Sequence, residues 1–447
     1  MTRARADRVC RDIALVRELD AQRQALHAEI GRLKSEQQDV SHLVDRSRTL
    51  SAQIEALSDS DGQSAAQVSA PAGSRSELLT TWEQVCAAGP EWQSLMPRAT
   101  AASPYMTWEW MASWYETYGE PGRTMCLVVR DEDGSAVGIA PLHLSGTRDP
   151  SLDRRDIGFA GTFGRARASY HEFVSAPQSH ETVAEATVEY LSSIDGQWDC
   201  AKFLWVPDSS DVTWYLIAAL IRRGWYIHVR PSVTATVMRL PSHEEEVIDA
   251  LSSRKFAANC RQAQQRLARD YPDHCFACVR DSTEAVACLD QYVNLNVVRR
   301  RGLGSSSRFL NVQYRRHFES STRRFAKAGW LRLSTLRVGD RLVGLQPSWL
   351  YHNRLYLLSP AWSEEYARYQ ISHQLFLHAI CQGIREGAKE ADFLSAEQEY
   401  KRWYSNETRS TMDILCWRSR PQMLTGLAAE AARALVAKAG RHLRLRR

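Results

Sequence analysis

Two stretches of the sequence, 126–144 and 331–350, have the same hairpin pattern. In each, an apolar strand runs into a Gly- and Asp-containing turn, and the returning strand reads Val-Gly-hydrophobic-X-Pro. Asp133-Gly134 forms the first turn and Gly339-Asp340 the second, and such pairs favour tight hairpin turns. A pattern that occurs twice in one chain indicates duplication of one structural unit.

Helical and strand patterns alternate around both hairpins, which predicts an α/β fold with mixed central sheets flanked by helices. In the first half the expected helices are 78–88, an aromatic helix near 108–118, 181–193 and 213–223, and the expected strands are 125–130, 136–144, 156–159, 171–174, 201–206 and 226–229. In the second half the expected helices are 244–270, 282–300, 315–328 and 373–386, and the expected strands are 276–280, 331–338, 342–350, 354–358 and 391–394.

The chain divides into five expected parts. Residues 1–57 carry a mostly apolar heptad seam from Val16 to Ile54, which predicts a coiled-coil helix and a homo-oligomer. A single amphipathic helix packed on its own body is the alternative. Small and polar residues make 58–76 an expected linker. The two α/β units are expected at 77–235 and 236–420, and a basic amphipathic helix at 421–447.

Charge and composition limit where in the cell the protein is expected and which partners it could bind. No stretch is apolar enough to cross a membrane, and the start lacks a signal-peptide pattern, so a cytoplasmic protein is expected. The net charge is +5, and residues 423–447 alone supply six basic residues and one acid. A neutral body argues against DNA binding. The basic tail could dock on the body, contact an anionic membrane or a partner, or remain solvated.

Cysteine spacing gives no metal site. Cys275 and Cys278 are the only closely spaced pair, and no second pair or HxxxH motif accompanies them. We therefore expect no metal cofactor. The sequence also lacks a GxSxG elbow and a P-loop, which argues against hydrolase and NTPase classes.

The stretch from Leu355 to Tyr404 is the strongest candidate for a site. An apolar strand runs through a long loop into a helix that is expected to begin near His373, with Ser372 as its N-cap. Free N–H groups and the helix dipole make such a helix start a binding place for phosphate. The same pattern also occurs in ordinary strand–helix connections.

Groups for acid–base chemistry follow in the same stretch. Asp392 ends an apolar strand, where burial would raise its pKa. Tyr400 could protonate a leaving group and Lys401 could stabilise an oxyanion. A surface turn with a Lys–Glu pair is the alternative.

Two further patches are weaker candidates. Tyr170, His171 and Glu172 follow a Gly-rich loop and could bind an acceptor or supply a base, although a structural histidine is the simpler interpretation. The basic residues of the expected helix 244–270, together with Arg299–Arg301, could line an anionic groove or be a solvated surface; they are Arg254, Lys255, Arg261, Arg266 and Arg269.

Four pieces of the sequence resemble the GNAT acetyltransferase superfamily in its CelD-like branch, linked to cellulose and polysaccharide biosynthesis. They are the aromatic helix followed by VVRDEDGSAVGIAPL, the basic helix LSSRKFAANCRQAQQRL, the segment Leu357-Leu-Ser-Pro with Tyr366, Tyr369 and Ser372, and DFLSAEQEYK from Asp392 to Lys401. The body is also similar to Fem-type aminoacyl transferases, which contain two GNAT-like units.

This resemblance implies tandem GNAT-like units, the second of which binds acyl-CoA. By position, Leu357, Leu358 and Ser359 would offer backbone groups to the pantetheine arm, and Tyr369, Ser372 and His373 would face the pyrophosphate. The sequence departs from the family pattern where Ser395-Ala396 replaces a common Gly, and it lacks a glycine-rich signature before the His373 helix.

The expected function is transfer of an acyl group from acetyl-CoA to an amine or hydroxyl of a small molecule, sugar or polysaccharide precursor. Catalytic roles are expected for Asp392, Tyr400 and Lys401, and acceptor binding for Tyr170, His171 and Glu172. The alternatives are an aminoacyl-tRNA-dependent transferase of the Fem type and a catalytically inactive scaffold.

Overall fold

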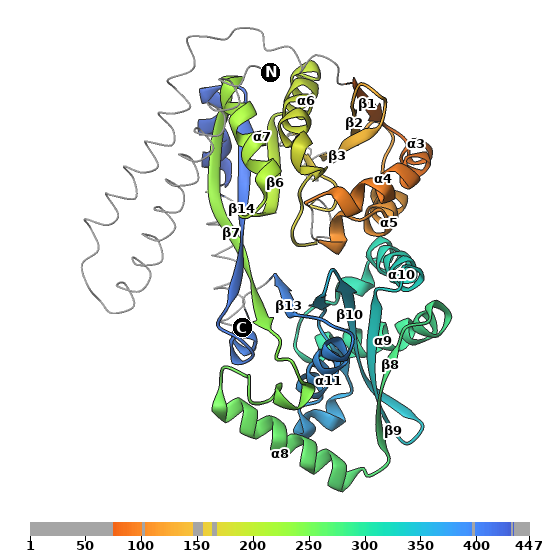
Figure 1. Cartoon of the computed structure of the whole chain (residues 1–447). Helices are drawn as coiled ribbons and strands as arrows, with labels where there is room; N and C mark the ends of the chain where they lie inside the picture. Colours follow the sequence, from red (N-terminus) through yellow and green to blue (C-terminus); the bar gives the residue numbers. More distant parts are fainter. Residues whose placement is uncertain are drawn as a thin grey trace, which may run out of the picture.

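The structure is a computed structural model that describes residues 75–100, 103–145, 155–162, 168–395, 398–430 and 432. The predicted coiled coil, nearly all of the predicted linker and the tail from 433 onwards lie outside these residues. Strands β1 to β14 join in one 14-stranded sheet, whose principal order is β1-β2-β3-β4-β6-β14-β7-β13-β11-β10-β9-β8. The sheet passes through both halves of the molecule (Figure 1).

The first half of the sheet is built around the first predicted hairpin. Its strands are β1 (Arg75–Leu79), β2 (Thr124–Arg130), β3 (Ala136–Ser145), β4 (Asp156–Phe159), β5 (Val174–Ser175) and β6 (Cys200–Pro207). The β2–β3 hairpin leads to β4, and β4 pairs in parallel with β6 after the connection through α6 (His180–Ser193). Other helices of this half are α3 (Trp82–Ala87), α4 (Gly89–Leu95), α5 (Trp108–Tyr118) and α7 (Asp211–Arg222).

The second half repeats this arrangement. Its strands are β8 (His274–Val279), β9 (Leu331–Val338), β10 (Arg341–Tyr351), β11 (Arg354–Leu357), β12 (Ala361–Trp362) and β13 (Glu390–Ser395). The β9–β10 hairpin leads to β11, which pairs in parallel with β13 after α11 (Ile371–Arg385). Helices α8 (Arg254–Asp270), α9 (Ser282–Gly302) and α10 (Val312–Lys327) complete this half. The predicted duplication of one α/β unit is thereby confirmed.

The two halves share strands. β7 (Tyr226–Arg239) pairs with β14 (Thr408–Trp417) along most of its length, and its end pairs with β13. β14 in turn pairs with β6. A strand from the end of the described chain therefore lies inside the sheet of the first half, where Figure 1 shows it in blue beside the green β7.

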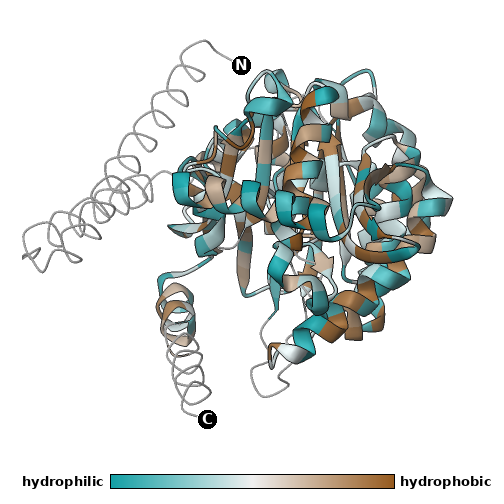
Figure 2. Cartoon of the chain, turned by 90° about the horizontal axis from the view of Figure 1, so that it is seen from below, coloured by the Kyte–Doolittle hydropathy of each residue, from teal (hydrophilic) through white to brown (hydrophobic). Residues whose placement is uncertain are grey.

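Helices cover the sheet with one apolar face each, and their ribbons carry both hydrophobic and hydrophilic residues (Figure 2). In α5, Trp108, Met111, Trp114 and Tyr115 are buried and pack into the core. Past β14, helical residues 420–430 dock on the first half, where Met423 and Leu427 pack against Trp417.

Several predicted boundaries were wrong. Residues 75–79 form β1 on the edge of the sheet, so they are neither linker nor helix, and the helix begins at Trp82 behind the capping box of Thr81 and Gln84. The helix expected from 244 begins at Arg254, because Ser253 caps it there. The strand expected at 171–174 is reduced to Val174–Ser175.

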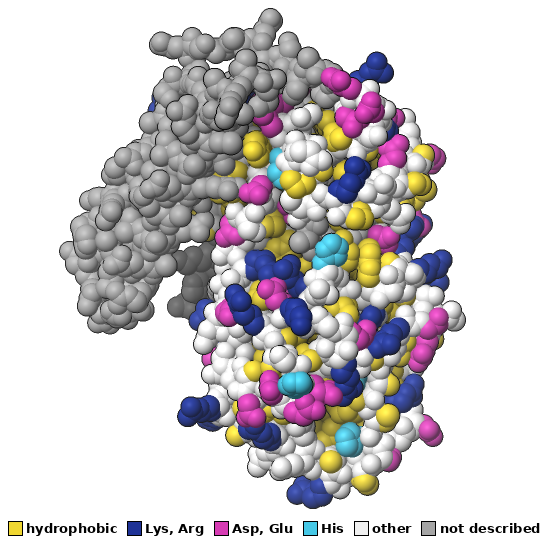
Figure 3. All heavy atoms as spheres, viewed as in Figure 1, with side chains coloured by type: hydrophobic (Ala, Val, Ile, Leu, Met, Phe, Trp, Pro, Cys, Tyr) yellow, Lys and Arg dark blue, Asp and Glu magenta, His cyan; other side chains and the backbone are white. Residues whose placement is uncertain are grey.

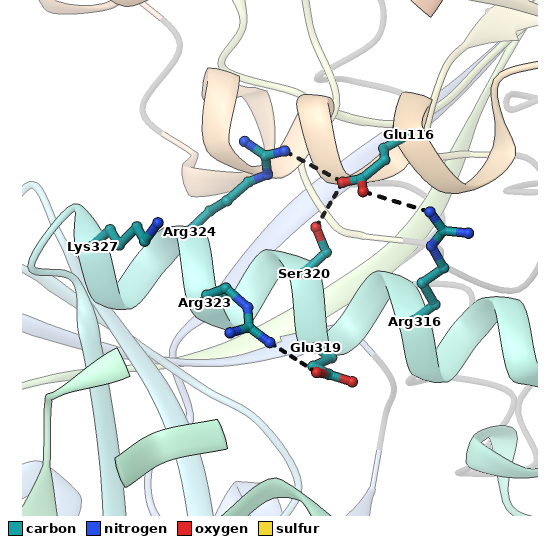
Figure 4. Close-up of a pocket in the computed structure, with 7 residues that line it drawn as sticks. All are labelled: Glu116, Arg316, Glu319, Ser320, Arg323, Arg324 and Lys327. Carbon is teal, nitrogen blue, oxygen red and sulfur yellow. Dashed lines mark hydrogen bonds and ion pairs between the residues drawn. The ribbon is translucent and has the colours of Figure 1, made fainter. Parts of the chain in front are cut away.

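Helices α5 and α10 hold the two halves together at one side. Glu116 on α5 accepts a hydrogen bond of 3.0 Å from the hydroxyl of Ser320 and pairs with Arg324 at 3.3 Å and Arg316 at 3.7 Å (Figure 4). Arg323 pairs within α10 with Glu319 at 2.9 Å. These side chains line an open pocket of about 380 Å³.

Candidate active site

A cavity of about 380 Å³ lies where the two halves meet. One wall comes from the parallel strands β11 and β13, whose pairing ends at Tyr356 and Asp392. Beyond that pair, Leu357 and Phe393 line the cavity instead of continuing the ladder. The cavity is therefore bounded by the diverging ends of the two parallel strands, where ligands bind in open α/β sheets.

Lys401 is the buried cation of this cavity. It lies in the short helix Glu399–Trp403, and its Nζ donates hydrogen bonds to the carbonyl oxygens of Phe393 (2.7 Å) and Leu394 (3.0 Å). Desolvation lowers the pKa of Lys401 to about 8, and the nearby Asp392 opposes this shift. Leu394 adopts a left-handed conformation with φ 58°, which is rare for a residue of this type. The end of β13 is thus bent to present its carbonyl groups to the ammonium group.

Side chains also bond the backbone of the predicted pantetheine strand. The amide of Gln346 donates to the carbonyl oxygen of Leu358 at 3.0 Å, and the hydroxyl of Tyr292 donates to that of Ser359 at 2.7 Å. The N–H of Leu358 donates to Pro347. Leu357, Leu358 and Ser359 all line the cavity as a group. Among the described residues, the hydroxyl and amide of Ser359 have no partner, so Ser359 keeps the most free hydrogen-bonding capacity of the three.

Asp392 is fully buried and held by three donors. Its Oδ2 accepts from the hydroxyl of Tyr170 (2.9 Å) and pairs with Arg409 (2.6 Å), and its Oδ1 accepts from the N–H of Leu394 (2.8 Å). Burial raises the pKa of Asp392, and the positive charge of Arg409 partly offsets this by lowering it. Asp392 does not line the cavity. The carboxylate instead anchors the bent end of β13 that carries the carbonyl partners of Lys401.

Tyr170, His171 and Glu172 have different surroundings, and the structure does not bring them together at the cavity. Tyr170 reaches Asp392 from a left-handed backbone position with φ 64°. His171 is buried against Gly161 and stacks on Phe159, and burial lowers its pKa to about 4. Glu172 is also buried, and none of the three lines the cavity.

The predicted phosphate-binding residues lie around the start of α11. The N-cap prediction for Ser372 was wrong: α11 begins at Ile371, because Gln370 adopts a left-handed conformation (φ 52°) and turns the chain directly into the helix. The Nδ1 of His373 lies 2.8 Å from the hydroxyl of Tyr404. Burial lowers the pKa of His373 to about 4, so the ring carries no charge at neutral pH. Tyr369 bonds Asp270 at 3.0 Å.

Tyr400 lies beside this group and not in the cavity. Its ring packs on Phe376 and on His373, and burial raises its pKa to about 12. Lys401 is therefore the one residue of the predicted catalytic group that lines the cavity.

Aromatic and arginine side chains form much of the rest of the cavity, and most of them were not predicted as site residues. From the first half come Tyr105, Trp110 and Trp205, and from the second Tyr292, Phe309, Tyr314, Phe318, Trp349, Arg300 and Arg308. Trp205 has a positive φ of 58°, as Leu394 does. The high tryptophan content of the sequence was the signal that could have pointed to these aromatic residues, but it does not distinguish residues of the cavity from residues of the core.

Within the described ranges, no cluster of three or more His, Cys, Asp or Glu side chains is placed to hold a metal ion. Among the helices that the structure describes, none combines the length and the apolar character of a membrane span.

Comparison with known proteins shows that part of the chain matches a protein family. Residues 254–402 match the family model described as "Acetyltransferase (GNAT) domain". This stretch contains Lys401, Asp392 and the whole β11–α11 region, whereas Tyr170 lies outside it. Comparison with curated proteins gives no match.

Solved structures of similar fold cover most of the chain. The crystal structure of FemX has 11% identity and a TM-score of 0.52, covering 78% of this chain and 99% of that one. A conserved protein of unknown function from Bacteroides thetaiotaomicron has 12% identity and a TM-score of 0.50, covering 77% and 100%. A tandem GNAT protein from the clavulanic acid pathway has 12% identity and a TM-score of 0.40, covering 76% and 98%.

The family match supports a GNAT acetyltransferase-type domain in residues 254–402, and the enzyme class that it supports is acyltransferase. In each half of the fold a hairpin is followed by two parallel strands.

Proposed function

We propose that this protein transfers an acyl group from acetyl-CoA to an amine or hydroxyl of a small-molecule or saccharide acceptor, as a member of the CelD-like branch. The observation that carries the proposal is the position of Lys401. Its ammonium group is buried in the wall of the cavity and fixed by the carbonyl oxygens of Phe393 and Leu394.

In this reaction the acceptor N–H or O–H group attacks the thioester carbonyl carbon, and negative charge develops on the carbonyl oxygen. Lys401 has two hydrogen bonds to the backbone and one N–H left, which would donate to this oxyanion. A donor held in place inside a desolvated site stabilises such a charge far more than water does. The carbon–sulfur bond then breaks, and the thiolate takes up a proton.

A lysine with a pKa of about 8 is suited to supply that proton, because this value is close to that of a free thiol. Lys401 then takes up the proton that the acceptor releases. Asp392 acts as a positioning residue in this scheme, because its three donors hold the bent end of β13.

The opposite wall suits an acceptor with a flat or ring-shaped apolar face. Tyr105, Trp110 and Trp205 from the first half and Tyr314 and Trp349 from the second half line the cavity. Aromatic rings pack on apolar faces, while Arg300 and Arg308 supply donors for oxygen atoms. Sugars combine such faces with many oxygens.

Aminoacyl-tRNA is a second candidate donor. It is favoured by the hydrogen bonds that Gln346 and Tyr292 make to the carbonyl oxygens of Leu358 and Ser359, because these bonds occupy groups that a pantetheine arm would use. A tRNA-borne ester needs no such groups.

Calorimetry with acetyl-CoA tests the proposal and separates the two donors. Wild-type protein should bind acetyl-CoA, and Lys401→Ala should retain this binding but lose turnover with acceptor sugars or amines. Absence of acyl-CoA binding at millimolar concentration would overturn acetyl-CoA as the donor. A gel shift with charged tRNA in that case would establish the second donor, and a chain that binds neither would be a scaffold.

A further inference from the structure

The segment 291–318 has an unusual charge pattern. It contains six arginines (Arg299, Arg300, Arg301, Arg308, Arg315 and Arg316) and no Asp or Glu. Residues 250–269 are likewise basic without an acid, whereas both signs are mixed over much of the face in Figure 3. The segment comprises the end of α9, the connecting residues 303–311 and the start of α10. We refer to residues 298–316 as the α9–α10 tip.

Apolar side chains are exposed on the same tip. In the part of the chain that the structure describes, the large hydrophobic side chains that are exposed are Val298, Leu303, Leu310, Val312, Trp403 and Leu424. Four of these six belong to the tip, where Val312 is 80% exposed and Val298 67% exposed. Exposed aliphatic side chains clustered in one place indicate an interaction surface.

Half of the tip arginines have acidic partners. Arg299 pairs with Glu364 and lies over the ring of Trp362, Arg315 pairs with Asp290, and Arg316 pairs with Glu116. In the described ranges, Arg300, Arg301 and Arg308 have no carboxylate within ion-pair distance. These three cations are therefore not neutralised by an ion pair within the described residues, and Arg301 and the four aliphatic side chains are exposed.

We propose that the α9–α10 tip docks on an anionic lipid bilayer. Aliphatic side chains that enter the headgroup region and arginines that attract acidic headgroups together give reversible peripheral attachment, whereas either feature alone is weak. The mixture also favours lipid over RNA. Single-stranded RNA is bound mainly by aromatic stacking, whereas the exposed apolar groups of the tip are Val and Leu.

Docking would set the orientation of the cavity. Tyr292, Asn296, Arg300, Ser306 and Arg308 line the cavity and belong to the same segment as the tip. A bilayer in contact with the tip would lie beside this wall. The inference goes beyond the proposed acyl transfer and does not depend on it.

Vesicle co-sedimentation of the full chain tests the inference. Vesicles of phosphatidylcholine with one quarter phosphatidylglycerol should bind the protein, and pure phosphatidylcholine vesicles should bind it at least ten-fold less. The test variant is Arg301→Glu/Leu303→Ser, whose positions do not line the cavity. It should lose at least ten-fold in binding to anionic vesicles, with an unchanged melting temperature.

The matched control is Lys255→Glu/Leu424→Ser. It makes the same changes of charge and polarity away from the tip, and Leu424 is 56% exposed against 60% for Leu303. This control should bind as wild type does. Equal binding to neutral and anionic vesicles, wild-type binding by the tip variant, or loss of binding only in the control would each overturn the inference. Binding of tRNA without binding of anionic vesicles would also overturn it and identify the tip as an RNA surface.

Discussion

The hydroxyl of Tyr170 donates a hydrogen bond of 2.9 Å to Oδ2 of Asp392 and so connects a residue of the first half to the last strand of the parallel pair in the second. Asp392 is fully buried, and its other partners are Arg409 and the N–H of Leu394. The bond therefore links the loop before β5 to the strand end that holds Lys401.

Tyr170→Phe should lower the free energy of unfolding by about 1.5–3 kcal/mol, because it removes a buried hydrogen bond to a charged group. Urea denaturation measures this change. Tyr190→Phe is the control, since the Tyr190 hydroxyl is buried with no partner among the described residues. A loss in Tyr190→Phe as large as that in Tyr170→Phe would show that the bond to Asp392 is not the cause.

Lys401→Ala should reduce kcat by about 10²–10³-fold, the usual effect of removing one oxyanion donor. Lys401→Arg keeps the charge but not the geometry, and it should recover only part of the rate. Steady-state kinetics with the acceptor found by screening measures both. Circular dichroism must show the same fold, and wild-type turnover in Lys401→Ala would remove this residue from the mechanism.

The rate should fall as the pH rises through about 8, because desolvation lowers the pKa of Lys401 to about 8 and only the protonated form donates to the oxyanion. The effect of pH on the free energy of unfolding has the opposite sign. Between this value and the ordinary 10.5, the unfolded chain binds more protons than the folded one, so the contribution of this group to stability rises with pH. A pH–rate profile that keeps the same descending limb in Lys401→Ala would contradict the assignment.

Gly161→Ala should destabilise the first half more than Gly196→Ala does. Both glycines have left-handed backbones, with φ of 89° and 85°, and an alanine there costs about 1–2 kcal/mol. At Gly161 the new Cβ would also lie 2.6 Å from the ring of His171, whereas at Gly196 it meets nothing within 4 Å. Overpacking adds about 1–3 kcal/mol. Equal denaturation midpoints for the two variants would show that the His171 ring moves freely.

Glu116→Gln should cost about 1 kcal/mol in unfolding free energy, because it weakens pairs with Arg316 and Arg324 that join α5 to α10. Glu319→Gln is the matched control, since among the described residues Glu319 forms an ion pair only within α10, and its loss should cost about 0.3–0.5 kcal/mol. If both variants unfold at the same urea concentration, the α5–α10 contact adds nothing to stability.

Local patterns made much of the fold predictable. Each of the two hairpins combines alternating apolar residues with turn residues. Both the strand pattern and the turn lie within a few neighbouring positions, so they can be read from the sequence alone. β14 was missed because its partners, β6 and β7, precede it by well over a hundred residues and no local turn marks the pairing.

The candidate site was predictable in part for the same reason. Lys401 and Asp392 lie close together in the sequence, which is why both were named as candidates, and the structure places Lys401 but not Asp392 in the lining of the cavity. Their surroundings, however, are set by Arg409, Tyr170 and the bent backbone of Leu394, which only tertiary structure reveals. Ser372 had the right chemistry for an N-cap, but the left-handed Gln370 started the helix earlier.

The place of β14 between β6 and β7 has a consequence for synthesis on the ribosome. The sheet of the first half lacks an interior strand until Thr408–Trp417 emerges, roughly 180 residues after β7. At about 5–20 residues per second this interval lasts roughly 10–40 s. During this interval β6 and β7 lack the strand that joins them in the finished fold, so we expect the nascent first half to depend on chaperones until β14 is made.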